Sequence, residues 1–297
     1  MFYFQNNPTF APLNKSIHMC PGKTINSNTS LSKIKLVAAD MDGTLLNAKH
    51  ELSPGFYPLF EQMKSKGILF AAASGRQFWN LLKLFEPIKK EVIFIAENGS
   101  FVMYKGEEIL VQAMEPGVVK ELLLEARNIP GVHTILCGKR SAYVQNREPE
   151  FIKNVEMYYD KYEVVDDLLQ INDDKFLKIA LCDLAGSEAN SYQFFKHRRD
   201  ELQVKISGHI WLDLSHKLAN KGRAINVLQQ KFNISPDETM VFGDYLNDLE
   251  MMQQASFSYA MENAHEDIKN AARFITKSNE EDGVNIVLQL LMNAVSI

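Results

Sequence analysis

Short apolar runs along the chain alternate with segments whose apolar residues recur at helical spacing. Nearly unbroken apolar runs predict buried strands, and the amphipathic segments between them predict helices. In chain order the predicted strands are Ile34–Ala39, Ile68–Ala73 and Val92–Ala96, and the predicted helices are Pro54–Ser65 and Gln77–Phe85. Such strands separated by helices are typical of a parallel sheet covered on both faces. We therefore predict an α/β fold built on a doubly wound parallel sheet.

The same pattern returns toward the C-terminus. The predicted strands there are Thr239–Phe242 and Phe257–Met261, and the predicted helices are Asn220–Phe232, Asp248–Gln254 and Gly283–Ala294. Because this alternation of strands and helices matches the N-terminal pattern, we expect these elements to complete the same sheet.

The segment between these two regions is patterned differently. Phe101–Met114 is expected to form a hairpin that turns at Lys105-Gly106, and isolated strands then alternate with helices at His133–Cys137, Ala142–Gln145 and Phe176–Leu181. This change of pattern predicts an inserted α+β domain. The predicted organisation is a tail of residues 1–32, a core domain of residues 33–115 and 208–297, and an inserted domain of residues 116–207.

Composition and charge exclude several classes of function. The 297 residues are 46% hydrophobic and carry a formal net charge of −5, with the acidic excess spread along the chain. No run of Lys and Arg could neutralise the phosphates of a duplex, so we expect no nucleic-acid partner. No segment approaches the roughly 20 apolar residues needed to cross a bilayer, so we expect no membrane partner either.

The N-terminal residues and the cysteines bear on location. The first thirty residues are rich in Asn, Ser, Thr and Pro and lack the basic start and apolar core of a secretory signal, so we expect a flexible tail. The three cysteines, Cys20, Cys137 and Cys182, are odd in number and widely spaced, which favours a reducing compartment. We expect a cytoplasmic protein.

Polar side chains follow each predicted core strand at the point where that strand ends. In chain order these clusters are Asp40 with Asp42, Ser74 with Arg76, Glu97–Gly99, and Gly243–Asp248. Parallel sheets bind their ligands at the carboxyl ends of the strands. If the first and fourth strands are neighbours, the two acidic clusters share one crevice.

The acidic pair Asp40 and Asp42 needs a counter-charge or a reaction, because an unpaired buried carboxylate costs several kcal/mol or takes up a proton. A hard divalent cation with oxygen ligands, Mg²⁺, suits such a crevice. A carboxylate beside Mg²⁺ can attack phosphorus, while Asp42 serves as acid and base and Gly43 turns the backbone amides toward the phosphoryl oxygens. Taken alone, Asp-x-Asp-Gly is also typical of a turn or of a calcium-loop fragment.

Four motifs in order resemble those of the haloacid dehalogenase superfamily of phosphohydrolases. They are Asp40-Met41-Asp42-Gly43-Thr44, Ser74-Gly75-Arg76, Lys221-Gly222 and Gly243-Asp244-Tyr245-Leu246-Asn247-Asp248. The form of the fourth motif resembles the Cof-type subfamily, which carries a cap domain between the second and third motifs. Further matches to that subfamily are Glu97-Asn98-Gly99, Ala260-Met261-Glu262-Asn263-Ala264 and Asn279-Glu280-Glu281-Asp282-Gly283-Val284. The resemblance covers Leu36 to the C-terminus, and the cap is matched by position and pattern.

The resemblance implies a role for each acidic residue of the motifs. Asp40 is the expected nucleophile and a Mg²⁺ ligand, and Asp42 is the expected acid and base with its backbone carbonyl on the metal. Asp244 is the expected second carboxylate ligand, and Asp248 supports the metal through water. Taken alone, Asp248 is also explained as a first-turn helix residue favoured by the helix dipole.

The resemblance also implies residues that bind the phosphoryl group or the substrate: Ser74, Gly75, Arg76, Asn98 and Asn247. Lys221 is expected to neutralise charge on the phosphoryl group and on Asp40, as a preorganised electrostatic contribution to catalysis. From the residues alone, Ser74-Gly75-Arg76 is equally typical of a helix N-cap and turn, and Lys217 is a second candidate for the lysine.

The expected function is a Mg²⁺-dependent phosphatase that hydrolyses a small phosphomonoester, a sugar phosphate, through an aspartyl-phosphate. A phosphotransferase or phosphomutase on the same scaffold is the first alternative. A non-enzymatic receiver module that is phosphorylated on a strand-end Asp is the second, and Asp42 and the inserted domain argue against it. The expected partner is a small phosphorylated molecule, and the protein is expected to be a monomer or homodimer.

Overall fold

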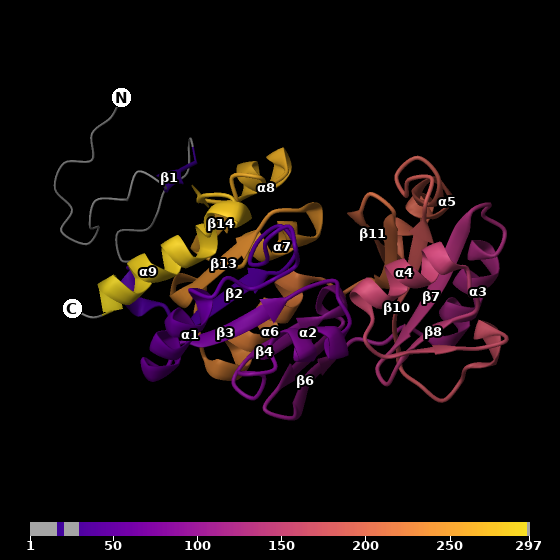
Figure 1. Cartoon of the computed structure of the whole chain (residues 1–297), viewed down its shortest axis with the longest axis horizontal. Helices are drawn as coiled ribbons and strands as arrows, with labels where there is room; N and C mark the ends of the chain where they lie inside the picture. The colour runs from indigo at the N-terminus through magenta and orange to yellow at the C-terminus, as the bar shows by residue number, and fades with distance from the viewer. Residues whose placement is uncertain (1–16, 21–29, 296–297) are drawn as a thin grey trace. The chain divides into compact units, whose positions relative to one another are not determined.

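A computed structural model describes residues 17–20 and 30–295 of the chain. These residues form two units (Figure 1). The first unit contains the described residues up to Ala71 and from Gln229 onward, and the second contains Ala72–Leu228. Among the described residues, no helix is both long and apolar enough to cross a membrane.

The first unit is built on parallel strands. The strands β2 (Leu36–Asp40), β13 (Thr239–Gly243), β14 (Phe257–Ala260) and β15 (Phe274–Ile275) lie in the order β15-β14-β13-β2 and are parallel to one another. In this register Ala39 pairs with Phe242. The residues that follow these two positions, Asp40 and Gly243-Asp244, therefore leave the sheet at the same level. The expected neighbourhood of the first and fourth strands is confirmed.

The helices of the first unit bury one face each. On α1 (Phe56–Ser65) the buried positions are Phe56, Leu59, Phe60 and Met63, which is the spacing of a single helical stripe. The last helix, α9 (Gly283–Val295), has a stripe of the same kind and packs beside α1 (Figure 1). The short helices α7 (Leu249–Met252) and α8 (Glu266–Ala271) pack against each other.

Two very short strands extend the first unit's sheet beyond what the sequence pattern indicated. Within the expected tail, β1 (His18–Met19) pairs antiparallel with β15, and Ile17 and Cys20 are buried beside it. The aromatic residues of the tail, Phe2, Tyr3, Phe4 and Phe10, lie outside the described residues. Strands of two residues show no alternation in sequence, so periodicity does not reveal them.

The second unit begins within β3 (Leu69–Ala73) and includes α2 (Phe78–Leu84) and the strands β4 (Ile93–Ala96), β5 (Phe101–Tyr104) and β6 (Glu107–Val111). These last three strands are antiparallel neighbours. The hairpin turns at Lys105 and Gly106, whose φ angles are 50° and 80°. Two consecutive positive φ angles are what a type I′ two-residue hairpin turn requires, and the antiparallel pairing of β5 with β6 confirms the expected hairpin.

The isolated strands expected in the middle of the chain form one six-stranded sheet. Its order is β11 (Leu202–Gly208), β12 (Trp211–His216), β10 (Phe176–Asp183), β7 (Val132–Gly138), β8 (Ala142–Val144) and β9 (Tyr162–Val164). Neighbouring strands are antiparallel except β8 and β9. Because β12 belongs to this sheet, the sheet extends past residue 207.

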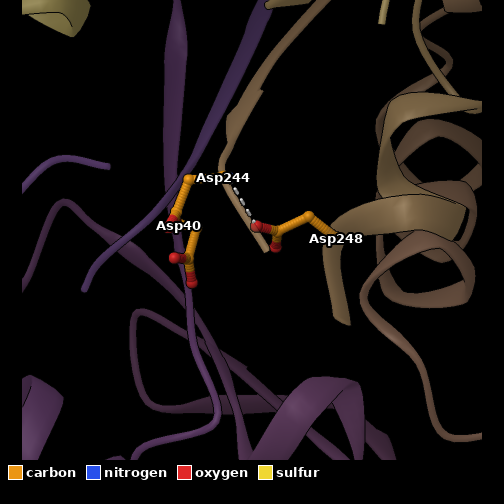
Figure 2. A group of neighbouring side chains, drawn as sticks. All are labelled: Asp40, Asp244 and Asp248. Carbon is orange, nitrogen blue, oxygen red and sulfur yellow. Dashed lines mark hydrogen bonds between the residues drawn. The ribbon is translucent and has the colours of Figure 1, made fainter. Parts of the chain in front are cut away.

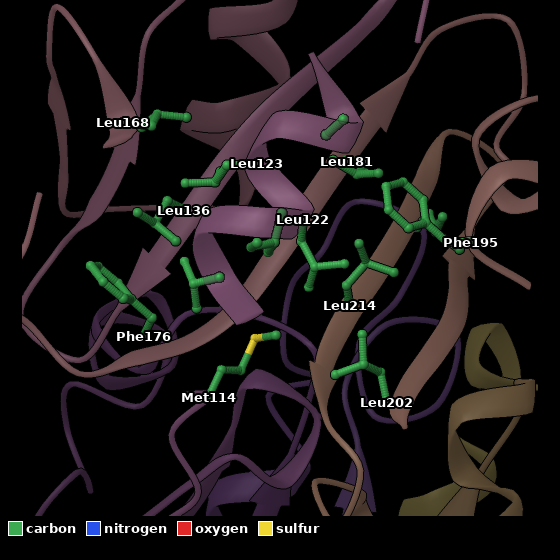
Figure 3. Close-up of a cluster of buried hydrophobic side chains, with 14 of the residues drawn as sticks. Met114, Leu122, Leu123, Leu136, Leu168, Phe176, Leu181, Phe195, Leu202 and Leu214 are labelled. Carbon is green, nitrogen blue, oxygen red and sulfur yellow. The ribbon is translucent and has the colours of Figure 1, made fainter. Parts of the chain in front are cut away.

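Alternating side chains of the six-stranded sheet supply two apolar clusters. On one face, residues such as Leu136 and Leu181 pack with α3 (Pro116–Ala126) and with Phe195 of α5 (Ser191–Phe195) (Figure 3). The other face carries Cys137, Ala180 and their neighbours against α4 (Pro149–Tyr158). The fold is the α/β arrangement with a parallel sheet and an α+β insertion that the pattern predicted.

Candidate active site

Three carboxylates converge in the first unit. Asp40 ends β2, Asp244 follows β13 directly, and Asp248 ends the 3-10 turn η6 (Leu246–Asp248). One carboxylate oxygen from each lies within 4.8 Å of the others, and Figure 2 shows the three side chains at the ends of their elements. Asp40 is 6% exposed and Asp248 is fully buried. The sequence predicted this convergence, and the parallel register of β2 and β13 produces it.

Two glycines make room for these carboxylates. A Cβ atom on Gly43 would lie 2.4 Å from Asp244 Oδ2, and one on Gly243 would lie 2.5 Å from Asp248 Oδ2. Gly43 also has a φ of +77°, a conformation that L-residues with side chains adopt only at a cost. The turn after Asp40 therefore requires glycine on both steric and conformational grounds.

Hydrogen bonds fix the orientation of two of the acidic groups. Thr44 Oγ1 donates to Asp244 Oδ1 at 2.7 Å. The backbone amides of Asp244 and Tyr245 donate to Asp248 Oδ2 at 3.0 and 3.3 Å. Thr44 is part of the first motif, but sequence reasoning assigned it no role. Its small size and its position two residues after Asp42 carry no signal that would have revealed the contact.

The cluster fits a hard divalent cation. Two unit charges 4.8 Å apart repel by roughly 3 kcal/mol at an effective dielectric of about 20, and three carboxylates make three such pairs. Carboxylate oxygens are the ligands preferred by Mg²⁺ and Ca²⁺. Among the residues that the structure describes, Asp40, Asp244 and Asp248 are the group of acidic, His or Cys side chains whose ligand atoms come this close. The three carboxylates can bind a metal ion.

The carboxylate of Asp42 is not a member of this cluster and is paired instead with a histidine. Asp42 Oδ1 lies 2.8 Å from His50 Nδ1, and the two side chains are 35% and 40% exposed. A small bridged turn, in which Leu46 pairs with both Asp42 and Leu52, brings the two together. Sequence reasoning missed His50, because a lone histidine in a turn has no metal-binding or catalytic spacing.

Two asparagines outside the four motifs support the loop that follows Asp40. Asn263 Nδ2 donates to the carbonyl of Gly43 at 2.8 Å, and Asn279 Nδ2 donates to the carbonyl of Leu46 at 2.9 Å. The backbone amide of Asn279 in turn donates to Asn263 Oδ1 at 3.2 Å. Both residues lie in stretches whose resemblance to the subfamily was noted without a role. Asn247, a predicted substrate-binding residue, lies in η6 beside Asp248.

The second unit holds the predicted phosphate-binding loop. Ser74 follows β3, and its amide donates to the carbonyl of Ile95 at 2.8 Å. The amide of Asn98 donates to the carbonyl of Ser74 at 2.9 Å, and the amide of Arg76 donates to Ser74 Oγ at 3.1 Å. A Cβ atom on Gly75 would lie 3.1 Å from Asn98 Oδ1. The structure therefore brings Ser74, Gly75, Arg76 and Asn98 together.

The side chain of Arg76 is held by two helices of the second unit. Its Nη1 donates to Asn80 Oδ1 at 2.9 Å on α2, and its guanidinium lies 5.3 Å from the ring centroid of Tyr158 on α4. The residue is 7% exposed. A guanidinium that lies over an aromatic ring and also donates a hydrogen bond to a side chain is held in one direction.

The two candidate lysines have different surroundings. Lys221 is the first residue of α6 (Lys221–Phe232) and is fully buried. Lys217 is exposed, and its ammonium donates to the carbonyl of Asp200. A Cβ atom on Gly99 would lie 2.4 Å from the carbonyl oxygen of Asn220, so the Glu97–Gly99 turn packs directly against the start of α6. Lys221 is thus buried where Lys217 is exposed, and its role in catalysis stays a prediction.

Comparisons with known proteins identify the family. A family model described as haloacid dehalogenase-like hydrolase matches residues 37–288. The 5-amino-6-(5-phospho-D-ribitylamino)uracil phosphatase YbjI of Escherichia coli is 34% identical over 263 residues, which cover 87% of this chain and 96% of the relative. Phosphatase YwpJ of Bacillus subtilis is 29% identical, covering 87% of this chain and 100% of the relative.

A solved structure has the same fold along nearly the whole chain. The crystal structure of SMU.1108c from Streptococcus mutans UA159 superposes with a TM-score of 0.81 at 28% identity, and the match covers 88% of this chain and 99% of the other. The resemblance inferred from the four motifs is thereby confirmed. The chain belongs to the haloacid dehalogenase-like hydrolase family and is a phosphohydrolase.

Proposed function

We propose that this phosphohydrolase is a Mg²⁺-dependent phosphatase that hydrolyses a small phosphomonoester through a phosphorylated Asp40. The observation that carries the proposal is the convergence of Asp40, Asp244 and Asp248 within 4.8 Å. A nucleophilic carboxylate beside a cation site is the arrangement that in-line attack on phosphorus needs. The proposed metal ligands are the three carboxylates together with the backbone carbonyl of Asp42. Bound there, Mg²⁺ would withdraw charge from the phosphoryl oxygens.

The reaction has two displacement steps. In the first, an Asp40 carboxylate oxygen forms a bond to phosphorus while the bond from phosphorus to the leaving oxygen breaks, and the Asp42 carboxyl gives its proton to that oxygen. In the second, Asp42 takes a proton from water as the water oxygen bonds to phosphorus. The bond from phosphorus to Asp40 then breaks and inorganic phosphate leaves. His50, 2.8 Å from Asp42, fixes the direction of the Asp42 side chain throughout.

Residues of the second unit are proposed to bind the transferred group. Ser74 donates its hydroxyl to a phosphoryl oxygen, and the buried Lys221 supplies a positive charge that need not be reorganised during the reaction. Gly75 and Arg76 shape the loop, and Asn98 orients the substrate together with Asn247 of the first unit. The six-stranded sheet with its helices is proposed to be the cap domain that selects the leaving group.

The proposed substrate is a phosphate ester of a sugar or of a sugar alcohol. Relatives from Escherichia coli and Bacillus subtilis, 34% and 25% identical to this chain, carry the name 5-amino-6-(5-phospho-D-ribitylamino)uracil phosphatase. That compound is a phosphomonoester of a ribityl chain, which belongs to the predicted substrate class. It is therefore the first compound to test. The expected cytoplasmic location and the expected monomer or homodimer stay predictions.

The test is phosphate release from a panel of phosphomonoesters by wild-type protein and by Asp40→Asn. The panel contains para-nitrophenyl phosphate, sugar phosphates, FMN and 5-amino-6-(5-phospho-D-ribitylamino)uracil. Asp40→Asn should abolish turnover with little change in melting temperature, and Asp267→Asn, at an exposed position of the same unit, should leave turnover unchanged. EDTA should abolish phosphate release by the wild-type protein, and added Mg²⁺ should restore it. Retained activity in Asp40→Asn, or activity indifferent to chelation, would refute the proposal, and an isomeric sugar phosphate as product would identify a mutase.

A further inference from the structure

A second group of charged side chains is buried in the second unit, apart from the carboxylates of the proposed metal site. It consists of Lys178 on β10, Asp213 on β12 and Glu97 in the turn after β4, with side chains that are 3%, 5% and 1% exposed. The pairing of Ala180 with Asp213 places Asp213 on the face of the six-stranded sheet that α4 covers, and Lys178, two residues from Ala180, points to the same face. Neither the motifs nor the proposed reaction uses Lys178 or Asp213.

The ammonium of Lys178 lies close to three oxygen atoms. Its Nζ donates to the carbonyl of Gly75 at 2.8 Å, and it lies 2.9 Å from Glu97 Oε2 and 3.4 Å from Asp213 Oδ2. The approach to Glu97 is close in distance but falls outside hydrogen-bond geometry. The bond to Gly75 is the significant one, because Gly75 is the middle residue of the proposed phosphate-binding loop.

The same charges also hold the turn that carries Asn98. Asn98 Nδ2 donates to Asp213 Oδ2 at 2.7 Å, and the side-chain amide of Asn98 lies against Gly75. The turn is strained, since Glu97, Asn98 and Gly99 have φ angles of 50°, 54° and 91°. Consecutive left-handed residues that are not glycine persist only where their surroundings hold them. Asp213 holds the turn by accepting a hydrogen bond from the Asn98 side chain, and Lys178 holds it through its ion pair with Glu97.

Electrostatics keep Lys178 charged in this environment. Burial by itself disfavours the ammonium, but Asp213 and Glu97 more than compensate and raise the pKa of Lys178 above its ordinary value. Burial raises the pKa of the Glu97 carboxyl, an effect that Lys178 opposes. Glu97 Oε1 has no hydrogen-bond partner among the described residues. A buried group of two carboxylates and one ammonium is a poor device for stability alone, because apolar side chains of similar volume would serve as well or better.

We propose that Lys178 is a positioning residue for phosphoryl binding, which fixes the Gly75 carbonyl and, through Glu97 and Asp213, the turn that carries Asn98. The inference rests on the proposed function, in which this loop binds the phosphoryl group and Asn98 orients the substrate. It assigns to a strand of the proposed cap domain a direct influence on phosphate affinity. A displacement of this loop weakens the binding of phosphate without changing the carboxylates that are proposed to bind Mg²⁺.

The experiment uses the double variant Lys178→Met/Asp213→Asn in the full-length chain. This variant removes one positive and one negative charge together, and the amide introduced by Asp213→Asn retains an oxygen that accepts from Asn98. The measurements are the Kd for inorganic phosphate by calorimetry with Mg²⁺ present, kcat on para-nitrophenyl phosphate, and the Mg²⁺ concentration for half-maximal activity. Lys175→Met, which changes an exposed lysine just before β10, is the matched control.

We expect the double variant to weaken phosphate binding and to lower kcat by about tenfold or more, with the Mg²⁺ requirement within about twofold of wild type. Lys175→Met should equal wild type in all three measurements. A folded double variant with wild-type phosphate affinity would overturn the inference, and so would parallel losses of phosphate and Mg²⁺ affinity, which indicate general disruption.

A second variant covers the case in which the double variant does not fold. Lys178→Arg keeps the positive charge, but a planar guanidinium cannot reproduce the three directions of an ammonium. It should raise the Kd for phosphate at least severalfold, and a wild-type Kd in this variant would also overturn the inference. If wild type and Asp40→Asn are equally inactive on every ester, the proposed function fails, whereas an active wild type with unaffected Lys178 variants removes only this inference.

Discussion

Replacing Gly43 with alanine tests whether the turn after Asp40 is built around the Asp244 carboxylate. Gly43 has a φ of +77°, and a Cβ atom there would lie 2.4 Å from Asp244 Oδ2. Ordinary contacts begin at 3.4 Å, so the carboxylate must move by 3.4 − 2.4 = 1.0 Å or the turn must open. The substitution therefore adds a displacement of Asp244, a proposed metal ligand, to an unfavourable backbone conformation.

Gly67→Ala separates these two contributions. Gly67 lies in the same unit with a φ of +72°, and a Cβ atom there would meet no heavy atom within 4 Å. The left-handed conformation alone costs about 1–2 kcal/mol for an L-residue with a Cβ, so Gly67→Ala should lose about that much unfolding free energy. Gly43→Ala should lose the same amount plus about 1.5–3 kcal/mol if the charged hydrogen bond from Thr44 to Asp244 is broken.

The two variants should differ most in activity. A misplacement of about 1 Å at a reacting centre can cost about 100-fold in rate, so Gly43→Ala should lose about that factor in kcat/KM and need more Mg²⁺ for half-maximal activity. Gly67→Ala should be as active as wild type at temperatures where it is folded. Urea denaturation gives the free energies, and phosphate release from para-nitrophenyl phosphate across a Mg²⁺ titration gives the activities. Equal Mg²⁺ requirements in the two variants would refute the assignment of Asp244 as a ligand held by this turn.

Two further predictions follow from single hydrogen bonds and from burial. Thr44→Val removes the donor to Asp244 and should raise the Mg²⁺ requirement severalfold, whereas Thr276→Val, which removes a bond of 2.8 Å to the carbonyl of Gly283, should lower the melting temperature without that effect. Because burial raises the pKa of Glu97, the folded state favours its protonated form and stability falls as pH rises through that pKa. Glu97→Gln should therefore have a melting temperature at least as high as that of wild type at pH 8, and its advantage should shrink toward pH 4.5. If Glu97→Gln instead lowers the melting temperature more at pH 8 than at pH 5, the carboxylate is the form that the folded state favours.

The sequence was sufficient for the parts of the fold that depend on local pattern. Apolar runs such as Val92–Ala96 are long enough to be recognised as buried strands, and the polar residues after β2 and β13 marked the carboxyl ends of strands that pair in parallel. Since such ends meet at one edge of a sheet, the cluster of Asp40, Asp244 and Asp248 was predictable before its distances were known.

The missing parts depend on contacts between residues far apart in the chain. Asp213 and Lys178 meet because β10 and β12 pair in one register, and neither lysine nor aspartate stands out in a strand whose partners are unknown. His50 reaches Asp42 through a turn with no regular pattern. Strands of two residues, β1 and β15, are too short for alternation to show. These features follow from tertiary pairing, which periodicity does not encode.

The two groups of acidic residues differ in the contacts that orient them. In the second unit the chain supplies its own cation, since Lys178 lies within 2.9 Å of Glu97 and 3.4 Å of Asp213. In the first unit Asp244 and Asp248 are oriented by neutral donors, the Thr44 hydroxyl and backbone amides, while they approach Asp40. These donors carry no positive charge, and a repulsion of roughly 3 kcal/mol per pair of carboxylates favours the binding of the proposed Mg²⁺. Lys178 is therefore proposed to fix the loop around Gly75, whereas carboxylates that approach one another this closely are suited to the proposed Mg²⁺ site.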